Sequence, residues 1–363
     1  YNSWPSNLRN CTYYPNLGSD VLQSVVYVSA AIAVIWCLLT LIPADFSTIL
    51  ATLNEPTPGA DSKLAIFKFD LDFGPSGVFN MASVLTGFVL LNIAAFGLDQ
   101  DMTQRLLTCK SDKEGSKALL LSIVMVIPVM LVFIFIGLLL YIVYQQPTLM
   151  NSDGAQVVQE FNGEKITIFM YYVLNEAPAG VKGLVSVGII AAAISTLNSG
   201  LSSMSSVIVQ DLYRPYLATK NKHVADTHFV KAGRVGMAVV SFALAMMAIL
   251  CYFWQQYSDM PLLKFALSVM VFSYSGLLGV YFTTLFTNRG SEGSVLAALI
   301  VGFMVTLLMQ PYMIDWLLPE SSRFYLGFTW QLCIGTALST LVCCLGKAQL
   351  AQRGQTAVGA EQV

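Results

Sequence analysis

Apolar segments of about twenty residues recur along this chain, and they constrain its fold more than any other feature. A bilayer core of about 30 Å requires about 20 apolar residues per helix. Hydrophobic residues make up 56% of the chain, charged residues only 11%, and mean hydropathy is +0.66, whereas a soluble domain carries roughly 25% charged residues. The sequence therefore predicts an all-α polytopic membrane protein with about eight transmembrane helices, at residues 20–43, 78–98, 118–144, 180–208, 231–254, 262–286, 293–314 and 325–345.

The predicted spans divide the chain into three parts. Residues 1–19 form an N-terminal segment, residues 20–346 a transmembrane domain, and residues 347–363 a polar tail expected to be disordered. With alternating loops, many more Lys and Arg residues fall on the side of the two ends than on the opposite side. The positive-inside rule then places both termini in the cytoplasm of a plasma or inner membrane protein. The chain begins with Tyr1 rather than Met, as expected of a fragment that starts within a longer protein.

The fourth predicted span carries a stripe of small hydroxyl residues. Ala192, Ser195, Thr196 and Ser199 fall at i, i+3, i+4 and i+7, which is one face of a helix. In hydrocarbon a hydroxyl needs a partner, so this face is expected to meet protein, water or an ion. Its oxygens suit a hard cation such as sodium. Close helix packing through small residues explains the same stripe without an ion.

Two acidic residues follow the second predicted span. Asp99 and Asp101 come shortly after Gly97, and acidic groups at the C-terminal end of a helix oppose its dipole. One explanation is a role at a solute pathway. The other is a helix end at Gly97 followed by an amphipathic helix in which Asp101 pairs with Arg105. The sequence leaves both open.

Polar groups also occur at the first and sixth predicted spans. Asp20, at the start of the first span, is either a helix cap beside Ser19 or a functional acid of a membrane helix. Residues 272–276, Phe-Ser-Tyr-Ser-Gly, lie in the middle of the sixth span. A helix break or wide turn there would line a cavity, and helix packing explains the residues equally well.

Residues suited to enzymatic chemistry are not grouped in this sequence. The only histidines, His223 and His228, fall in a basic loop and are expected to be solvated. The seven cysteines lack metal-type spacing, and no phosphate-binding motif occurs. No basic run suggests nucleic acid. We therefore predict no enzyme, no catalytic residue, no cofactor and no metal other than sodium.

The order and spacing of these features resemble the sodium:solute symporter family, over residues 18–346. The most specific matching blocks are AAAISTLNSGLSS...DLY from Ala191, DQDMTQR...KSDKEG from Asp99, and LLGVYFTTLFTNRGSEGS from Leu277. The resemblance implies a LeuT-like inverted-repeat transporter fold, with solute and sodium near the membrane midplane. By the same resemblance, most of the first repeat is missing from this chain.

The resemblance also implies binding residues. The main sodium site would use the carbonyl of Ala192 and the hydroxyls of Ser195 and Thr196. A second sodium site of some members would use Asp20, Ser195 and Ser199, with Asn198 where those members have serine. The solute pathway and inner gate would include Asp99, Gln100, Ser268, Phe272 and Tyr274.

The function implied is secondary active transport. Sodium would be the coupling ion, and the partners would be sodium, the lipid bilayer and a small polar organic solute: a sugar, sialic acid, amino acid or carboxylate. The sequence leaves the solute, the sodium stoichiometry and the oligomeric state open. The alternative is a non-transporting membrane sensor or regulatory module, or an inactive truncated transporter.

Overall fold

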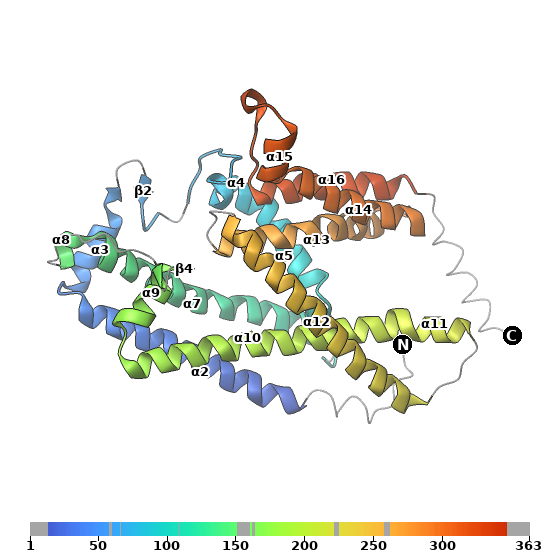
Figure 1. Ribbon diagram of the computed structural model, residues 1–363, viewed down its shortest axis with the longest axis horizontal. Helices are drawn as coiled ribbons and strands as arrows, with labels where there is room; N and C mark the ends of the chain where they lie inside the picture. Colours follow the sequence, from blue (N-terminus) through green and yellow to red (C-terminus); the bar gives the residue numbers. More distant parts are fainter. Residues whose placement is uncertain are drawn as a thin grey trace. The chain divides into compact units, whose positions relative to one another are not determined.

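The structure, a computed structural model, describes residues 14–57, 60–65, 67–107, 109–150, 160–161, 164–220, 225–257 and 262–346. Helices dominate these residues, and the strands among them form two short antiparallel hairpins (Figure 1). The chain divides into two compact units. Unit 1 contains Tyr1–Ala65 and Gln104–Ser241, and unit 2 contains Ile66–Thr103 and Phe242–Val363.

Three long helices form the centre of unit 1: α2 (Tyr14–Leu41), α7 (Asp112–Gln145) and α10 (Ala179–Val207). Helix α2 packs against both of the others (Figure 1). The core between them is aliphatic and includes Val34, Leu38, Leu139 and Ile142, all fully buried. Unit 1 is therefore organised around α2.

Helices α2 and α10 approach each other closely at a glycine. A Cβ atom placed on Gly188 would lie 3.2 Å from the Cα of Tyr27 and 3.6 Å from the Cβ of Ala30. A larger residue at 188 would therefore push the two backbones apart. Small residues allow this kind of close contact between membrane helices.

Helix α10 does not end at its last regular turn. It continues through a π-helical stretch, η4 (Ile208–Tyr213), into α11 (Arg214–Thr219). The Tyr213 hydroxyl lies 2.9 Å from Nε2 of His228, and the two rings are stacked. The prediction of a solvated loop residue was wrong for His228, which lies in α12 (Asp226–Tyr257). His223 lies outside the described residues.

The remaining elements of unit 1 are short. Ile168–Tyr171 and Tyr172–Glu176 form α9 and a π-helical turn, η3, which stop before Pro178. Of these elements, only α9 lines the cavity described below, through Phe169. The others are α3 (Phe46–Asn54), β1 (Pro56–Thr57), β2 (Ala60–Ser62), α8 (Pro147–Met150), β3 (Glu160–Phe161) and β4 (Glu164–Lys165).

Unit 2 is built on three helices that pack on one another: α13 (Leu262–Phe286), α14 (Glu292–Leu308) and α16 (Phe328–Cys344). The segment before them runs through η1 (Gly77–Phe79), α4 (Met81–Ser83), the π-helical η2 (Val84–Phe88) and α5 (Val89–Gly97), with α6 (Gln100–Leu107) following. Helix α5 contacts α13 and α16. This places the turn after Gly97 beside α13, where the site residues of unit 2 lie.

The interior of the three-helix group is polar and tightly packed. Ser275 on α13 is fully buried, and its Oγ donates to the Gly302 carbonyl at 2.9 Å and lies 3.1 Å from the Thr306 hydroxyl. At Gly279 an added Cβ would overlap the Cβ of Ser339 on α16. These contacts satisfy the hydroxyls of Ser275 and Thr306, and the close approach to Ser339 requires the absence of a side chain at residue 279.

A bend of 75° separates α14 from α15 (Pro311–Leu317). Gln310 is extended at the bend, and Pro311 has no N–H to continue the helical pattern. The buried Gln310 amide donates to Oε1 of Gln331 on α16 at 3.0 Å. The predicted span at residues 293–314 therefore contains a sharp bend, and the bent pair α14–α15 together forms one candidate span. A short turn, η5 (Glu320–Ser322), leads on toward α16.

Among the described residues, fewer helices than the eight predicted meet the length and hydropathy expected of a membrane span. Within the described residues, five helical segments are long and apolar enough to cross a bilayer, or six if the bent pair α14–α15 counts as one span. The five are Val21–Leu41, Asp112–Gln145, Ala179–Thr219, Thr227–Gln256 and Leu262–Phe286. The segments Met81–Gly97 and Phe328–Cys344 are apolar but shorter than the roughly 20 residues of an upright span.

Of the two explanations left open for residues 272–276, a helix break and helix packing, the structure does not show the break. Helix α13 runs without interruption through this segment, because Ser275 bonds across to α14 and the backbone of Gly276 packs near the Cα of Leu299. The helix-packing explanation holds for these two residues.

We expect Gly279→Val to destabilise the protein, because the branched side chain would have to displace α16 from α13. Overpacking of this kind costs about 1–3 kcal/mol. The measurement is the thermal unfolding midpoint of the purified chain in detergent. Gly293→Val is the matched control, since a Cβ there meets no atom within 4 Å. Equal midpoints for the two variants would contradict the packing described.

Candidate functional site

The hydroxyl face of α10 brings two of the predicted sodium ligands together. The Thr196 hydroxyl donates to the Ala192 carbonyl at 3.1 Å, and the Ser199 hydroxyl donates to the Thr196 carbonyl at 3.2 Å. Such bonds back to the preceding turn are usual for hydroxyls in helices. A carbonyl oxygen has two lone pairs, so the Ala192 oxygen keeps one for another partner.

These residues are accessible rather than locked in a core. Thr196 and Asn198 are exposed, and Ala192, Ser195 and Ser199 are half-buried. The donor set, a carbonyl and hydroxyls, fits a hard cation, but such ions take about six oxygen ligands or more. One helix face can supply only part of that shell.

The predicted partner of this face, Asp20, lies on α2. Its side chain is outside the described residues, but its backbone position is helical. Helices α2 and α10 run in opposite directions (Figure 1) and meet where Gly188 packs on Tyr27. Asp20 lies seven residues before Tyr27, and Ser195 lies seven after Gly188, a helical rise of about 10 Å in each case. The backbone of Asp20 is therefore level with that of Ser195.

Asp99 has a structural role in the turn between α5 and α6. Its Oδ1 accepts the Asp101 N–H at 2.9 Å, and its carbonyl accepts both the N–H and the hydroxyl of Thr103. An acidic group interacts unfavourably with the dipole of a helix that ends beside it, as α5 does, and favourably with the dipole of a helix that begins there, as α6 does. The start of α6 therefore offsets the unfavourable position of the Asp99 charge after α5. The predicted pairing of Asp101 with Arg105 involves a side chain outside the described residues.

The predicted solute-pathway residues of unit 2 fall into two groups. Asp99, exposed at the end of α5, interacts electrostatically with Tyr274 on α13, and Gln100 is the exposed first residue of α6. The Ser268 hydroxyl donates to the carbonyl of Lys264, one turn earlier. The ring of Phe272 packs in an aromatic cluster, with its centroid 5.7 Å from the ring centroid of Trp254. Asp99 and Gln100 are therefore accessible, whereas Phe272 is occupied in packing.

A polar turn before α4 was not singled out in the sequence. Asp72 accepts the Gly74 N–H at 2.8 Å and the Ser76 hydroxyl at 2.5 Å, and these hydrogen bonds hold the pKa of its carboxyl below the usual value. Asn80, which caps α4, donates to the Asp72 carbonyl. The Asp-Phe-Gly-Pro-Ser order of residues 72–76 is a turn signal that could have identified it.

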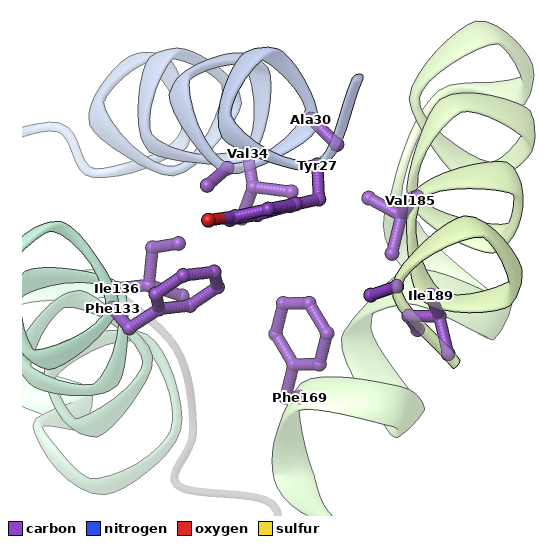
Figure 2. A pocket seen from close by; sticks show the side chains of 11 residues that line it. Tyr27, Ala30, Val34, Phe133, Ile136, Phe169, Val185 and Ile189 are labelled. Atoms are coloured by element: carbon purple, nitrogen blue, oxygen red, sulfur yellow. The ribbon is translucent and has the colours of Figure 1, made fainter. Parts of the chain in front are cut away.

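A cavity of about 290 Å³ lies among α2, α7, α9 and α10 in unit 1 (Figure 2). Its lining is apolar and includes Tyr27, Val34, Phe133, Phe169 and Val185. Ala192 borders it as well, so the cavity adjoins the expected sodium face. No sequence pattern marks this cavity, because its lining residues do not differ in type from other residues of apolar spans.

Comparison with known proteins gives the chain a family. The model of the sodium:solute symporter family matches residues 17–302. The sodium/sialic acid symporter of Proteus mirabilis is 24% identical over 80% of this chain and 54% of its own length. The sodium/glucose cotransporter of Vibrio parahaemolyticus is 24% identical over 72% and 47%, and human sodium-coupled monocarboxylate transporter 1 is 24% identical over 82% and 46%.

The chain spans about half the length of the curated relatives it matches. The family and these relatives are transporters rather than enzymes, which confirms the prediction that the chain is not an enzyme. The long apolar helices, together with the family, also confirm a polytopic integral membrane protein. Since the family model covers most of its residues, including the hydroxyl face of α10 and the Asp99 turn, the chain belongs to the sodium:solute symporter family.

Proposed function

We propose that this protein couples the entry of sodium to the uptake of a small polar organic solute by alternating access, in a LeuT-like arrangement of helices. The family and the sodium-coupled relatives support this function. The observation that carries it is the contact between the Thr196 hydroxyl and the Ala192 carbonyl on α10, which groups hard oxygen donors on a membrane helix.

Ala192, Ser195 and Thr196 form the main sodium site in this proposal. Asp20, Asn198 and Ser199 contribute to a second one, supported by the level backbone positions of Asp20 and Ser195. An amide oxygen at Asn198 is an acceptable ligand for a hard cation. The remaining oxygens come from other parts of the protein.

Sodium drives transport by stabilising one conformation. An ion that binds the outward-open state better shifts the population toward it, and its release into the cytoplasm reverses the shift. Each charge gains about 2.3 kcal/mol per 100 mV of membrane potential. Because binding coupling is reciprocal, solute raises sodium affinity by the same factor by which sodium raises solute affinity.

The solute is a sugar, sialic acid, amino acid or carboxylate, passing Asp99, Gln100, Ser268, Phe272 and Tyr274. The printed names of the relatives, a sialic acid, a glucose and a monocarboxylate carrier, define the first panel to test. Asp99 and Gln100 are exposed at the turn between α5 and α6, where a solute could reach them.

Thr196→Ala is expected to weaken sodium binding, because the site loses one oxygen ligand. Loss of an interaction with a charged group costs about 1.5–3 kcal/mol, or roughly tenfold or more in affinity. The measurement is the binding of radioactive sodium to the purified chain, followed by sodium-dependent uptake of the panel in proteoliposomes. Thr196→Ser retains the hydroxyl and serves as the control. Unchanged sodium affinity in Thr196→Ala would contradict the assignment.

Two variants separate the charge of Asp99 from its role in starting α6. Asp99→Asn keeps a side-chain oxygen for the Asp101 N–H but removes the charge, and we expect it to reduce solute uptake at normal thermal stability. Asp99→Ala removes both, and its unfolding midpoint should also fall. Normal uptake kinetics in Asp99→Asn would leave Asp99 with the structural role alone.

We propose that both ends of the chain, and the loop between α6 and α7, face the cytoplasm. Lys110 is exposed in this loop. We expect Lys110→Cys to react with a membrane-impermeant maleimide only after permeabilisation of cells, measured as the increase over the parent chain with its native cysteines. Labelling of Lys110→Cys in intact cells would reverse the orientation.

A further inference from the structure

Two polar contacts join the far half of the α10 rod to the start of α12, and all four residues belong to unit 1. The buried Ser205 hydroxyl on α10 donates to the Gly233 carbonyl on α12 at 2.7 Å. Farther along the rod, the Tyr213 hydroxyl lies 2.9 Å from Nε2 of His228, and the two rings are stacked. We call these two contacts the α10–α12 clamp.

Neighbouring residues support both contacts of the clamp. A Cβ atom on Gly236 would lie 2.8 Å from the Ser205 Oγ, so α12 approaches α10 closely because residue 236 has no side chain. Beside Tyr213, the guanidinium carbon of Arg214 lies 5.2 Å from the centroid of the Phe229 ring, within the range of a cation–π interaction. The two helices are therefore held at two separate levels.

The π-helical stretch η4 brings Tyr213 onto the side of the rod that faces α12. Tyr213 follows Ser205 by eight residues, which in a regular α-helix would turn it about 80° away from the direction of Ser205. A π-helical turn lags by about one residue, or about 100°, and this returns Tyr213 to within about 20° of that direction. Both residues can therefore contact the same neighbouring helix.

The clamp holds α10 from the side opposite Thr196. Ser205 follows Thr196 by nine residues within regular α-helix, which is a rotation of about 180°. Because Ser205 faces α12, Thr196 points away from α12. The rotation of α10 about its own axis therefore determines the direction in which the Thr196 hydroxyl lies.

We propose that η4 is a conformational device that fixes the rotation of α10, and that Tyr213 and His228 are positioning residues for the oxygen ligands on the opposite face. The contact at Ser205 alone would let the helix pivot, whereas a second contact on the same side, farther along the rod, prevents this. Only the link to sodium rests on the proposed function. The clamp itself rests on the contacts between α10, η4 and α12.

Amide hydrogen exchange of the purified protein tests the clamp. Tyr213→Phe and His228→Phe each remove the hydrogen bond but keep a ring for stacking. Each should speed exchange in α11 by roughly two- to tenfold, the effect of one hydrogen bond on an equilibrium. The double variant should match the single variants, because both substitutions remove the same bond.

Tyr216→Phe is the matched control for these variants. Tyr216 is a 53% exposed residue of α11 whose ring lies 4.6 Å from the Lys220 ammonium, and this contact does not need its hydroxyl. Exchange in Tyr216→Phe should equal that of the parent protein. Single variants that exchange like the parent, or a double variant in which their effects multiply, would overturn the clamp.

Changing the length of η4 tests the role of its extra residue. Deleting the exposed Leu212 places Tyr213 seven residues after Ser205, which in a regular α-helix is again within about 20° of its direction. This deletion should therefore leave exchange in α11 as slow as in the parent. Inserting one alanine after Leu212 turns Tyr213 away by about 100° and should speed exchange as Tyr213→Phe does. The reverse pattern would overturn the role assigned to η4.

Radioactive sodium binding tests the link to the sodium site. Tyr213→Phe keeps every assigned ligand, so a two- to tenfold weaker affinity at an unchanged unfolding midpoint would support positioning. Faster exchange in α11 with unchanged sodium affinity would overturn the link and leave the sodium site standing. Absence of sodium binding in the parent protein would contradict the proposed function instead, and hydrogen exchange would still decide whether the clamp exists.

Discussion

Close approach of helix backbones at positions without a side chain is the constraint on which both units depend. Lipid tails are as apolar as leucine, so burial alone does not hold membrane helices together, and packing and interhelical hydrogen bonds must do so. In unit 1 the contact is Gly188 against Tyr27, and in unit 2 it is Gly279 against Ser339. Because α2 and α10 meet at this first contact, the backbone of Asp20 lies at the same height along the helix pair as the hydroxyl face of α10.

The hydrophobic pattern predicted where the long helices lie, but not how each one ends. Helices α7 and α13 were predicted because each is a long run of apolar residues. Pro128 lies inside α7, and the polar residues 272–276 lie inside α13, but neither ends its helix. The bend before Pro311 was missed because a proline in an apolar run either kinks a helix or begins a new one. The buried pair Gln310 and Gln331, distant in sequence, favours the second outcome here.

Much of the candidate site could be predicted where it depends on the spacing within one helix. The α10 face is of this kind, since Ala192 and Thr196 are four residues apart and meet by helical geometry alone. Asp99 shows the limit: its role in starting α6, through the hydrogen bond from the Asp101 N–H, depends on how the chain turns between α5 and α6. The apolar cavity depends on four helices at once, and its residues are chemically ordinary.

The π-helical stretch after α10 changes how the two ends of that long helix are oriented. A π-helical turn holds one residue more than an α-helical turn, so the side chains beyond it lag by about one residue, or roughly 100°. Residues 214–219 therefore do not continue the stripe of Ser195 and Ser199, although all belong to one unbroken rod. When the stripe faces one neighbouring helix, Tyr216 and Lys220 at the far end of the rod therefore face a direction about a quarter turn away from that helix.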